Sequence, residues 1–260
     1  MTWIVISVFG ALMQAVRTAA QKTLNETMSN LGTTYVRSLV GLPIVLAFLV
    51  LIMLTLEPRW PSLTAAYLAC TAAGAAAQVI ATMLLIYLFK LRNFAIGTML
   101  IKVDVVMTAL VGTLLFSEVL SLLGVVALLV VTLGVVLISL GRVGLGKLRR
   151  EGEALSLRDA VFGLPTLVAL GSAFAFTLSY LFLREATLLL EPGHFLWRAA
   201  WTVVIATALQ TLVLGVYIVA REPAVFGQIW PKRRIIGFIG LTSALGSIAW
   251  YAAFAIQNAS

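Results

Sequence analysis

Several residue types that build catalytic and metal sites are nearly absent from this chain. Its 260 residues include one cysteine, one histidine and only 10 aspartates and glutamates. A single cysteine, Cys70, cannot form a disulfide within the chain. A single histidine, His194, excludes a histidine-based metal cluster and a Ser-His-Asp triad. The phosphate-binding pattern GxxxxGK[ST] is also missing, so we expect no ATP-driven step. The sequence predicts a protein without metal or cofactor.

Charge is scarce as well, and long hydrophobic runs replace it. Charged residues make up 11% of the chain, hydrophobic residues 62%, and the mean hydropathy is +1.07. Soluble domains carry about 25% charged residues, and a helix needs about 20 apolar residues to cross the hydrocarbon of a bilayer. Unbroken runs also differ from the alternating pattern of barrel strands. The sequence therefore predicts an all-α integral membrane protein with eight transmembrane helices, near 2–21, 34–55, 65–88, 95–116, 120–141, 160–183, 195–220 and 235–257.

The net charge of +8 comes from basic residues gathered on one side of the predicted membrane. One side has Arg59 and Arg184, and the other has twelve basic residues: Lys22, Lys90, Arg92, Arg142, Lys147, Arg149, Arg150, Arg158, Arg221, Lys232, Arg233 and Arg234. Cytoplasmic loops carry such an excess. We therefore expect a cell (inner) membrane protein with a cytoplasmic basic linker at 142–159 and an outside N-terminus, and we do not interpret the charge as a nucleic-acid surface.

The two halves of the chain share a series of short matches. The segment Gly32-Thr-Thr-Tyr-Val-Arg37 matches Gly193-His-Phe-Leu-Trp-Arg198, with glycine and arginine at the same spacing. The sequences Glu57-Pro58 and Trp60-Pro61 in the next loop return as Glu222-Pro223 and Trp230-Pro231, and Asn93 is matched by Asn258. A unit of five crossings must enter the membrane upside down in its second copy, and inverted repeats are typical of secondary transporters.

These matches predict the domain organisation. Residues 1–141 form a first repeat of five helices, 142–159 the linker, and 160–260 a second repeat that stops after three helices. A complete second copy would need about two further helices. We interpret the chain as a fragment or truncated product, with partner helices supplied from elsewhere as the alternative.

The stretch from Asn93 to Gly134 resembles the EamA-type members of the drug/metabolite transporter superfamily. The matching residues are Ala95, Lys102, Val106, Glu118, Gly124 and Gly134, while Val105 replaces a usual proline and Ser117 precedes the acidic turn. Arg37 and Arg198 also stand where that family often has arginine. The resemblance implies a ten-helix transporter of small metabolites with a central cavity between its repeats. Relatives are often drawn with the N-terminus inside, contrary to the charge bias here.

Charged residues inside membrane spans are costly and indicate function or a partner. Lys102 and Asp104 lie deepest, with Asp104 near the middle of its predicted helix. Two positions apart, they point about 200° from one another on an α-helix and cannot pair well. We expect Lys102 to attract an anionic or zwitterionic solute, and Asp104 either to pair with a base during transport or to take up a proton.

Other polar and aromatic residues inside spans are further candidates. Arg17, Arg37 and Arg198 are expected either to form a gate or anion-binding site or to extend to the headgroups, because they lie within a turn or two of a span end. Gln14 and Gln78 either line a water path or bond to neighbouring helices. Trp250 and Tyr251 either stack on a solute or pack within the bundle. The predicted substrate cavity thus combines Lys102, Asp104, Gln14, Gln78, Trp250 and Tyr251.

The leading interpretation is a multi-pass transporter of a small organic solute, working by alternating access, and not an enzyme. Its partners are the lipid bilayer and the solute; oligomer formation stays open. A non-transporting scaffold or inactive remnant is the alternative. A lipid-modifying membrane enzyme is a third interpretation, disfavoured because Asp104 is the only acid buried in a predicted span.

Overall fold

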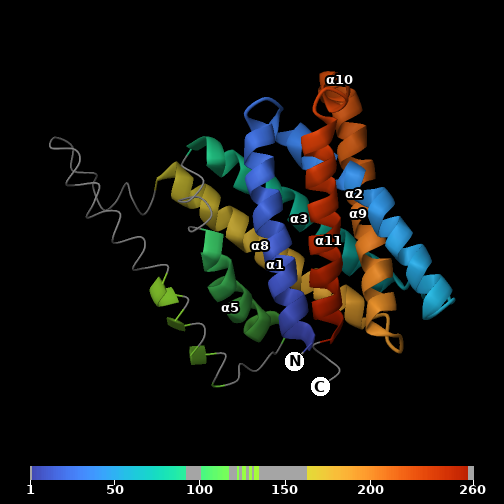
Figure 1. Cartoon of the computed structure of the whole chain (residues 1–260). Helices are drawn as coiled ribbons and strands as arrows, with labels where there is room; N and C mark the ends of the chain where they lie inside the picture. Colours follow the sequence, from blue (N-terminus) through green and yellow to red (C-terminus); the bar gives the residue numbers. More distant parts are fainter. Residues whose placement is uncertain are drawn as a thin grey trace. The chain divides into compact units, whose positions relative to one another are not determined.

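The computed structural model of the chain describes residues 2–91, 101–116 and 163–256, with isolated positions between 122 and 134. Within these residues all regular structure is helical, and Figure 1 shows the order of the elements. They are α1 (Thr2–Asn25), α2 (Asn30–Thr55), α3 (Ala65–Leu91), the 3-10 turn η1 (Ile101–Val103), α5 (Asp104–Phe116), α8 (Leu164–Leu188), α9 (Phe195–Arg221), α10 (Ala224–Ile229) and α11 (Arg233–Ile256).

Six of these helices are long and apolar enough to cross a membrane: α1, α2, α3, α8, α9 and α11. They confirm the six predicted spans that begin at 2, 34, 65, 160, 195 and 235. The short helix α10 was not predicted, and it lies in the loop before Trp230. The fifth predicted span lies largely outside the described residues, and the linker at 142–159 lies entirely outside them. The count of eight helices stays a prediction.

The chain divides into two compact units. The first contains residues 1–79 and 179–260, and the second contains residues 80–178. Each unit therefore combines segments from both halves of the sequence. The first unit holds α1, α2, α9, α10 and α11 with parts of α3 and α8, and the second holds η1, α5 and the remaining parts of α3 and α8.

In the first unit, α1 packs along α11 and α2 packs along α9 (Figure 1). Gly10 faces Ala249, and Gly246 faces Met13, so α1 and α11 are antiparallel. Just after α1, the Lys232 ammonium donates to the Thr27 carbonyl at 2.5 Å. This pair follows the same antiparallel register between the α1 and α11 segments. The α1–α11 seam is close because glycine on either helix lets the backbones approach.

Polar contacts join α2 and α9 at both of their ends. At one end the Ser29 hydroxyl donates to the Glu222 carboxylate at a distance of 2.5 Å. The same hydroxyl caps α2 by accepting from the Gly32 N–H. At the other end the Glu57 carboxylate accepts from the His194 N–H at 2.9 Å. The start of each helix thus lies beside the end of the other, so α2 and α9 are antiparallel. This direction agrees with an inverted repeat, which stays a prediction for the chain as a whole.

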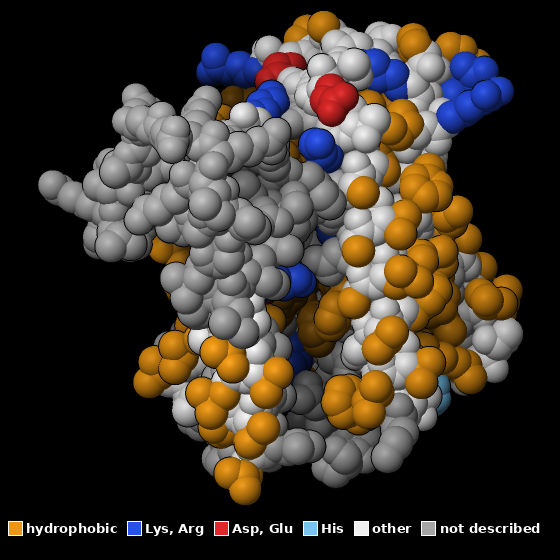
Figure 2. Space-filling model, turned by 60° about the vertical axis from the view of Figure 1, so that its left-hand side comes forward, with side chains coloured by type: hydrophobic (Ala, Val, Ile, Leu, Met, Phe, Trp, Pro, Cys, Tyr) orange, Lys and Arg blue, Asp and Glu red, His pale blue; other side chains and the backbone are white. Residues whose placement is uncertain are grey.

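Apolar side chains cover the flanks of the helices. Exposed residues on α2 and α9 include Val50, Leu54, Leu212 and Val216, as expected for surfaces that meet lipid tails. Figure 2 shows hydrophobic side chains over the flanks of the described helices and charged side chains gathered mainly at one end. In the first unit, the end that joins α1 to α2 and α9 to α11 carries Lys22, Arg221, Lys232, Arg233 and Arg234.

A labelling experiment tests the orientation that this charge distribution predicts. In a Cys70→Ser background, we expect a membrane-impermeant maleimide to label Ser62→Cys in intact cells and Gly227→Cys only after permeabilisation. Both positions are exposed, and a Cβ at Gly227 meets nothing within 4 Å. Labelling of Gly227→Cys alone in intact cells would reverse the predicted orientation.

Candidate functional site

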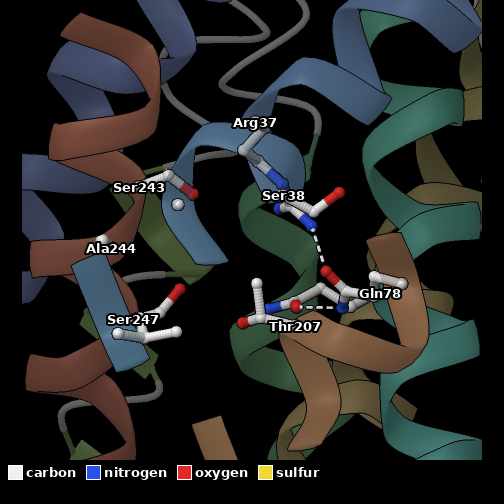
Figure 3. A pocket seen from close by; sticks show the side chains of 10 residues that line it. Arg37, Ser38, Gln78, Thr207, Ser243, Ala244 and Ser247 are labelled. Atoms are coloured by element: carbon white, nitrogen blue, oxygen red, sulfur yellow. Dashed lines mark hydrogen bonds between the residues drawn. The ribbon is translucent and has the colours of Figure 1, made fainter. Parts of the chain in front are cut away.

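A chain of buried polar side chains crosses the first unit from α2 to α3. The Arg37 guanidinium on α2 donates to the Gln210 amide oxygen on α9 at 2.9 Å (Figure 3). The Gln210 amide nitrogen then donates to the Gln78 amide oxygen at 2.7 Å and to the Ala75 carbonyl at 3.3 Å. Arg37 is 3% exposed and Gln210 is 4% exposed. Burying such groups is unfavourable unless they are hydrogen-bonded, so the network holds three helices in one arrangement.

The network borders a small polar cavity. Three serines contribute to its lining, Ser38 from α2 and Ser243 and Ser247 from α11, together with Thr207 of α9 (Figure 3). Its volume is about 10 Å³, close to the minimum for one water molecule. In this conformation the polar site of the first unit therefore has room for a water molecule but not for an organic solute.

Arg17 on α1 lies at the same depth as Arg37. Arg17 is eight residues before the end of α1, and Arg37 is seven residues after the start of α2. At 1.5 Å per residue, both lie about 10–12 Å from the end where the two helices join. Arg17 is 5% exposed. Extension to the lipid headgroups is therefore wrong for both side chains, because neighbouring helices cover them.

Two of the predicted cavity residues meet at the seam between α1 and α11. The Trp250 indole N–H donates to the Gln14 amide oxygen at 3.0 Å. Trp250 also stacks on Tyr180 of α8, with ring centroids 6.3 Å apart. Tyr251 is 2% exposed and lies within electrostatic range of Arg37. Both the N–H group and the ring of Trp250 thus contact neighbouring helices, which favours packing over solute stacking for this residue.

Comparison with known proteins adds one finding. The model of the EamA-like transporter family matches residues 1–140, which is more than half of the chain. The chain belongs to the EamA-like transporter family. No curated protein and no solved structure matches it. Membership makes this EamA-like chain an integral membrane protein of a transporter family, as the resemblance around residues 93–134 predicts.

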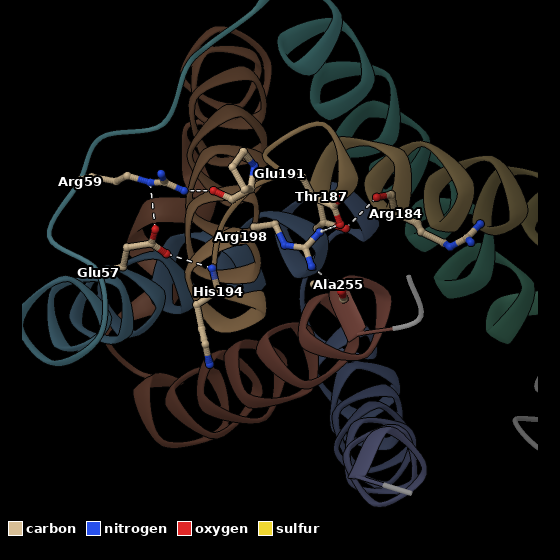
Figure 4. Close-up of polar contacts among 9 residues, drawn as sticks. Glu57, Arg59, Arg184, Thr187, Glu191, His194, Arg198 and Ala255 are labelled. Atoms are coloured by element: carbon tan, nitrogen blue, oxygen red, sulfur yellow. Dashed lines mark hydrogen bonds and ion pairs between the residues drawn. The ribbon is translucent and has the colours of Figure 1, made fainter. Parts of the chain in front are cut away.

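Arg198 is the third predicted gate or anion-binding residue. It joins helices of the first unit at the end away from the α1–α2 connection. Its guanidinium is 4% exposed, donates to the Glu191 carboxylate at 2.6 Å and donates to the Ala255 carbonyl at 2.7 Å (Figure 4). Nearby, Arg59 pairs with Glu57 at 2.9 Å and also donates to the Pro192 carbonyl. Arg198 thus ties α9 to α11 and to the loop after α8, and it does not line the Arg37 cavity.

We expect Arg198→Gln to destabilise this EamA-like protein by about 1.5–3 kcal/mol, the value of a buried hydrogen bond to a charged group. Glu191 is half exposed, so its released carboxylate regains water and adds little to the loss. Thermal unfolding in detergent measures the change. Arg221→Gln, an exposed site on the same helix, is the control and should shift the unfolding temperature little. Equal shifts of the unfolding temperature in the two variants would show that the Arg198 contacts with Glu191 and Ala255 do not stabilise the fold.

Lys102 and Asp104 lie in the second unit. The interpretation of both as positions on one continuous α-helix was wrong, because residues 101–103 wind as the 3-10 turn η1 and Asp104 is the first residue of α5. A helix N-terminus favours negative charge, so the carboxylate has a local stabilising partner that the prediction lacked. Asp104 is 7% exposed, whereas Lys102 is exposed. Their roles in transport stay predictions.

Gln210 was missed in the sequence, although it joins Arg37 to Gln78. The signal was present: a glutamine near the middle of the apolar span at 195–220 is a polar group that must find a partner in the membrane. Within the described parts of the chain, no group of three or more His, Cys, Asp or Glu residues is placed to hold a metal ion.

Proposed function

We propose that this EamA-like protein carries a small organic solute across the cytoplasmic membrane by alternating access. The observation that carries the proposal is the buried network of Arg37, Gln210 and Gln78 beside a small polar cavity. Polar residues buried at membrane depth commonly mark solute pathways. Three different helices supply the network, so a change in their packing would change the cavity.

The contacts at the two ends of α2 and α9 give the cavity its two gates in this proposal. Ser29 and Glu222 close one end, and Glu57 and His194 close the other. Opening one pair while the other stays closed would expose the cavity to one side of the membrane at a time. The antiparallel direction of α2 and α9 supports this scheme, since inverted repeats rock around a central site. Asp104 is the proposed site of proton coupling, because it is a buried acid.

A flux assay tests the proposal. The protein in liposomes is offered labelled amino acids, carboxylates, nucleotide sugars and lipophilic drugs, with protein-free liposomes as the control. We expect uptake of at least one class well above the control, since family membership and the buried polar site both favour solute movement. No uptake of any class would instead favour the second candidate, a membrane scaffold, which the small volume of the cavity supports.

A further inference from the structure

The inner face of α1 carries buried hydrogen-bond donors that find no acceptor among the described residues. They are the Nε of Arg17 and the Nε2 of Gln21, two side chains that are 5% and 1% exposed. Arg17 and Gln21 are four residues apart, so they lie one above the other on the same helix face. Within the described part of the chain, no carboxylate forms an ion pair with Arg17.

A second positive charge lies close to this face. Arg37 is at the same depth on α2, and the two guanidinium groups are near enough to repel one another. The register that sets Gly10 against Ala249 and Met13 against Gly246 places Arg17 opposite Thr242 and Ser243 of α11. Ser243 also lines the cavity beside Arg37. Both arginines are therefore placed next to the stretch of α11 that carries the Thr242 and Ser243 hydroxyls.

This arrangement is unfavourable for an empty protein. Burying a cation without a partner has a large free-energy cost, and a second cation nearby adds to it. Among the described residues, the side chains that helix spacing and register place beside Arg17 are Gln21, Gln14 and Ser243, which offer hydrogen bonds but no negative charge. What would complete the site is a ligand that brings acceptors and negative charge together, and carboxylate and phosphate oxygens do both.

We infer that Arg17, with Arg37 across from it, binds an oxyanion, and that the transported solute carries a carboxylate or phosphate group at this point. The inference rests on the proposed function for its link to transport, but the binding itself does not require flux. It names Arg17 as the charged group that the ligand neutralises, Gln21 as a neutral donor beside it, and Arg37 as the cation shared with the cavity. The cavity volume of about 10 Å³ excludes an organic anion. Binding of such a ligand therefore requires the cavity to enlarge.

Thermal unfolding of the full chain in neutral-lipid nanodiscs tests the site without transport. We expect succinate or inorganic phosphate, at about 100 times its Kd, to raise the unfolding temperature by roughly 5–10 °C. An equal concentration of tetramethylammonium chloride should give no rise. Parallel nanodiscs with anionic lipid distinguish a lipid headgroup from a free solute. A rise with lipid alone would support an oxyanion site at Arg17 and overturn its assignment to the transported solute.

Replacing the cation separates a ligand site from a structural one. We expect Arg17→Met to raise the unfolding temperature of the empty protein by roughly 2–4 °C, because an uncompensated charge is replaced by an apolar group. The same variant should lose the shift with succinate and phosphate. Arg221→Met, at an exposed arginine, should keep the shift unchanged. A purely structural Arg17 would instead be destabilised by the substitution.

The outcomes keep this inference distinct from the proposed function. No shift with either anion or with anionic lipid, or an equal shift in Arg17→Met, would overturn the oxyanion site. Flux of an uncharged or cationic solute that is unchanged in Arg17→Met would also overturn it, while leaving the transporter proposal intact. An anion shift that Arg17→Met abolishes, in a protein without flux, supports the site and contradicts transport alone.

Discussion

Replacing Arg37 by glutamine is expected to lower solute flux roughly 10- to 100-fold. The substitution removes the charged donor that reaches Gln210 at 2.9 Å and that borders the cavity. A hydrogen bond to a charged group contributes about 1.5–3 kcal/mol, and each 1.4 kcal/mol is about a factor of ten. Uptake into liposomes, at equal amounts of inserted protein, measures the loss for whichever solute class the wild type transports.

Two further variants show whether the loss comes from the site. Arg37→Lys keeps the charge but not the planar guanidinium, so we expect intermediate flux. Arg221→Gln removes an exposed arginine and should keep wild-type flux. Because the uncharged glutamine side chain is shorter than arginine and loses the bond to Gln210, fluxes are compared at equal amounts of folded protein, with thermal unfolding in detergent as the check. Full flux in Arg37→Gln would exclude Arg37 from the solute pathway.

Substitution of Gly240 by alanine is expected to destabilise the protein by about 1–3 kcal/mol, the usual range for overpacking a core. Gly240 on α11 faces Val40 on α2, where an added Cβ would overlap the Val40 side chain and come within 3.1 Å of its backbone carbonyl carbon. The two helices would have to separate. Because Val40 lies three residues after Arg37, we also expect reduced flux. Chemical or thermal unfolding in detergent measures the stability, and the liposome assay measures the flux.

The same helix provides a matched control for this substitution. A Cβ at Gly237 would meet nothing within 4 Å, so Gly237→Ala should be neutral or stabilising by about 0.5–1 kcal/mol through helix propensity. Val40→Ala in the Gly240→Ala background should restore part of the stability, since it removes one of the overlapping atoms. Equal stability of Gly237→Ala and Gly240→Ala would show that α2 and α11 are not in close contact there.

The membrane class and six spans could be predicted because their causes are local. A run of about 20 apolar residues can satisfy its backbone in lipid only as a helix, and neither Gly41 in α2 nor Pro43 interrupts the run. The predicted start of the second span, near 34, was four residues late, although the Ser29 cap is a local signal for the observed start at Asn30. The 3-10 turn before Asp104 was not predictable in the same way, because a 3-10 turn and an α-helix are both compatible with this apolar sequence.

The candidate site was only partly predictable for a different reason. A charged or polar side chain inside a span needs a hydrogen-bond partner. On that basis Arg37, Gln78, Gln14 and Trp250 could be selected from the sequence as site candidates. Which partner each one takes depends on helix register. Gln210 sits 173 residues from Arg37 in the chain, and no periodicity within either helix sets that pairing.

By itself, the sequence determined that the chain is a helical membrane protein, that polar groups are rare inside its spans, and that its first half matches a transporter family. The tertiary structure alone decided that Arg198 is an ion-paired lock while Arg17 is a buried cation without an acceptor in the described chain. The two arginines have similar apolar neighbours in sequence. Their difference arises because the energy of a buried charge is set by the groups that other helices bring within a few ångströms of it.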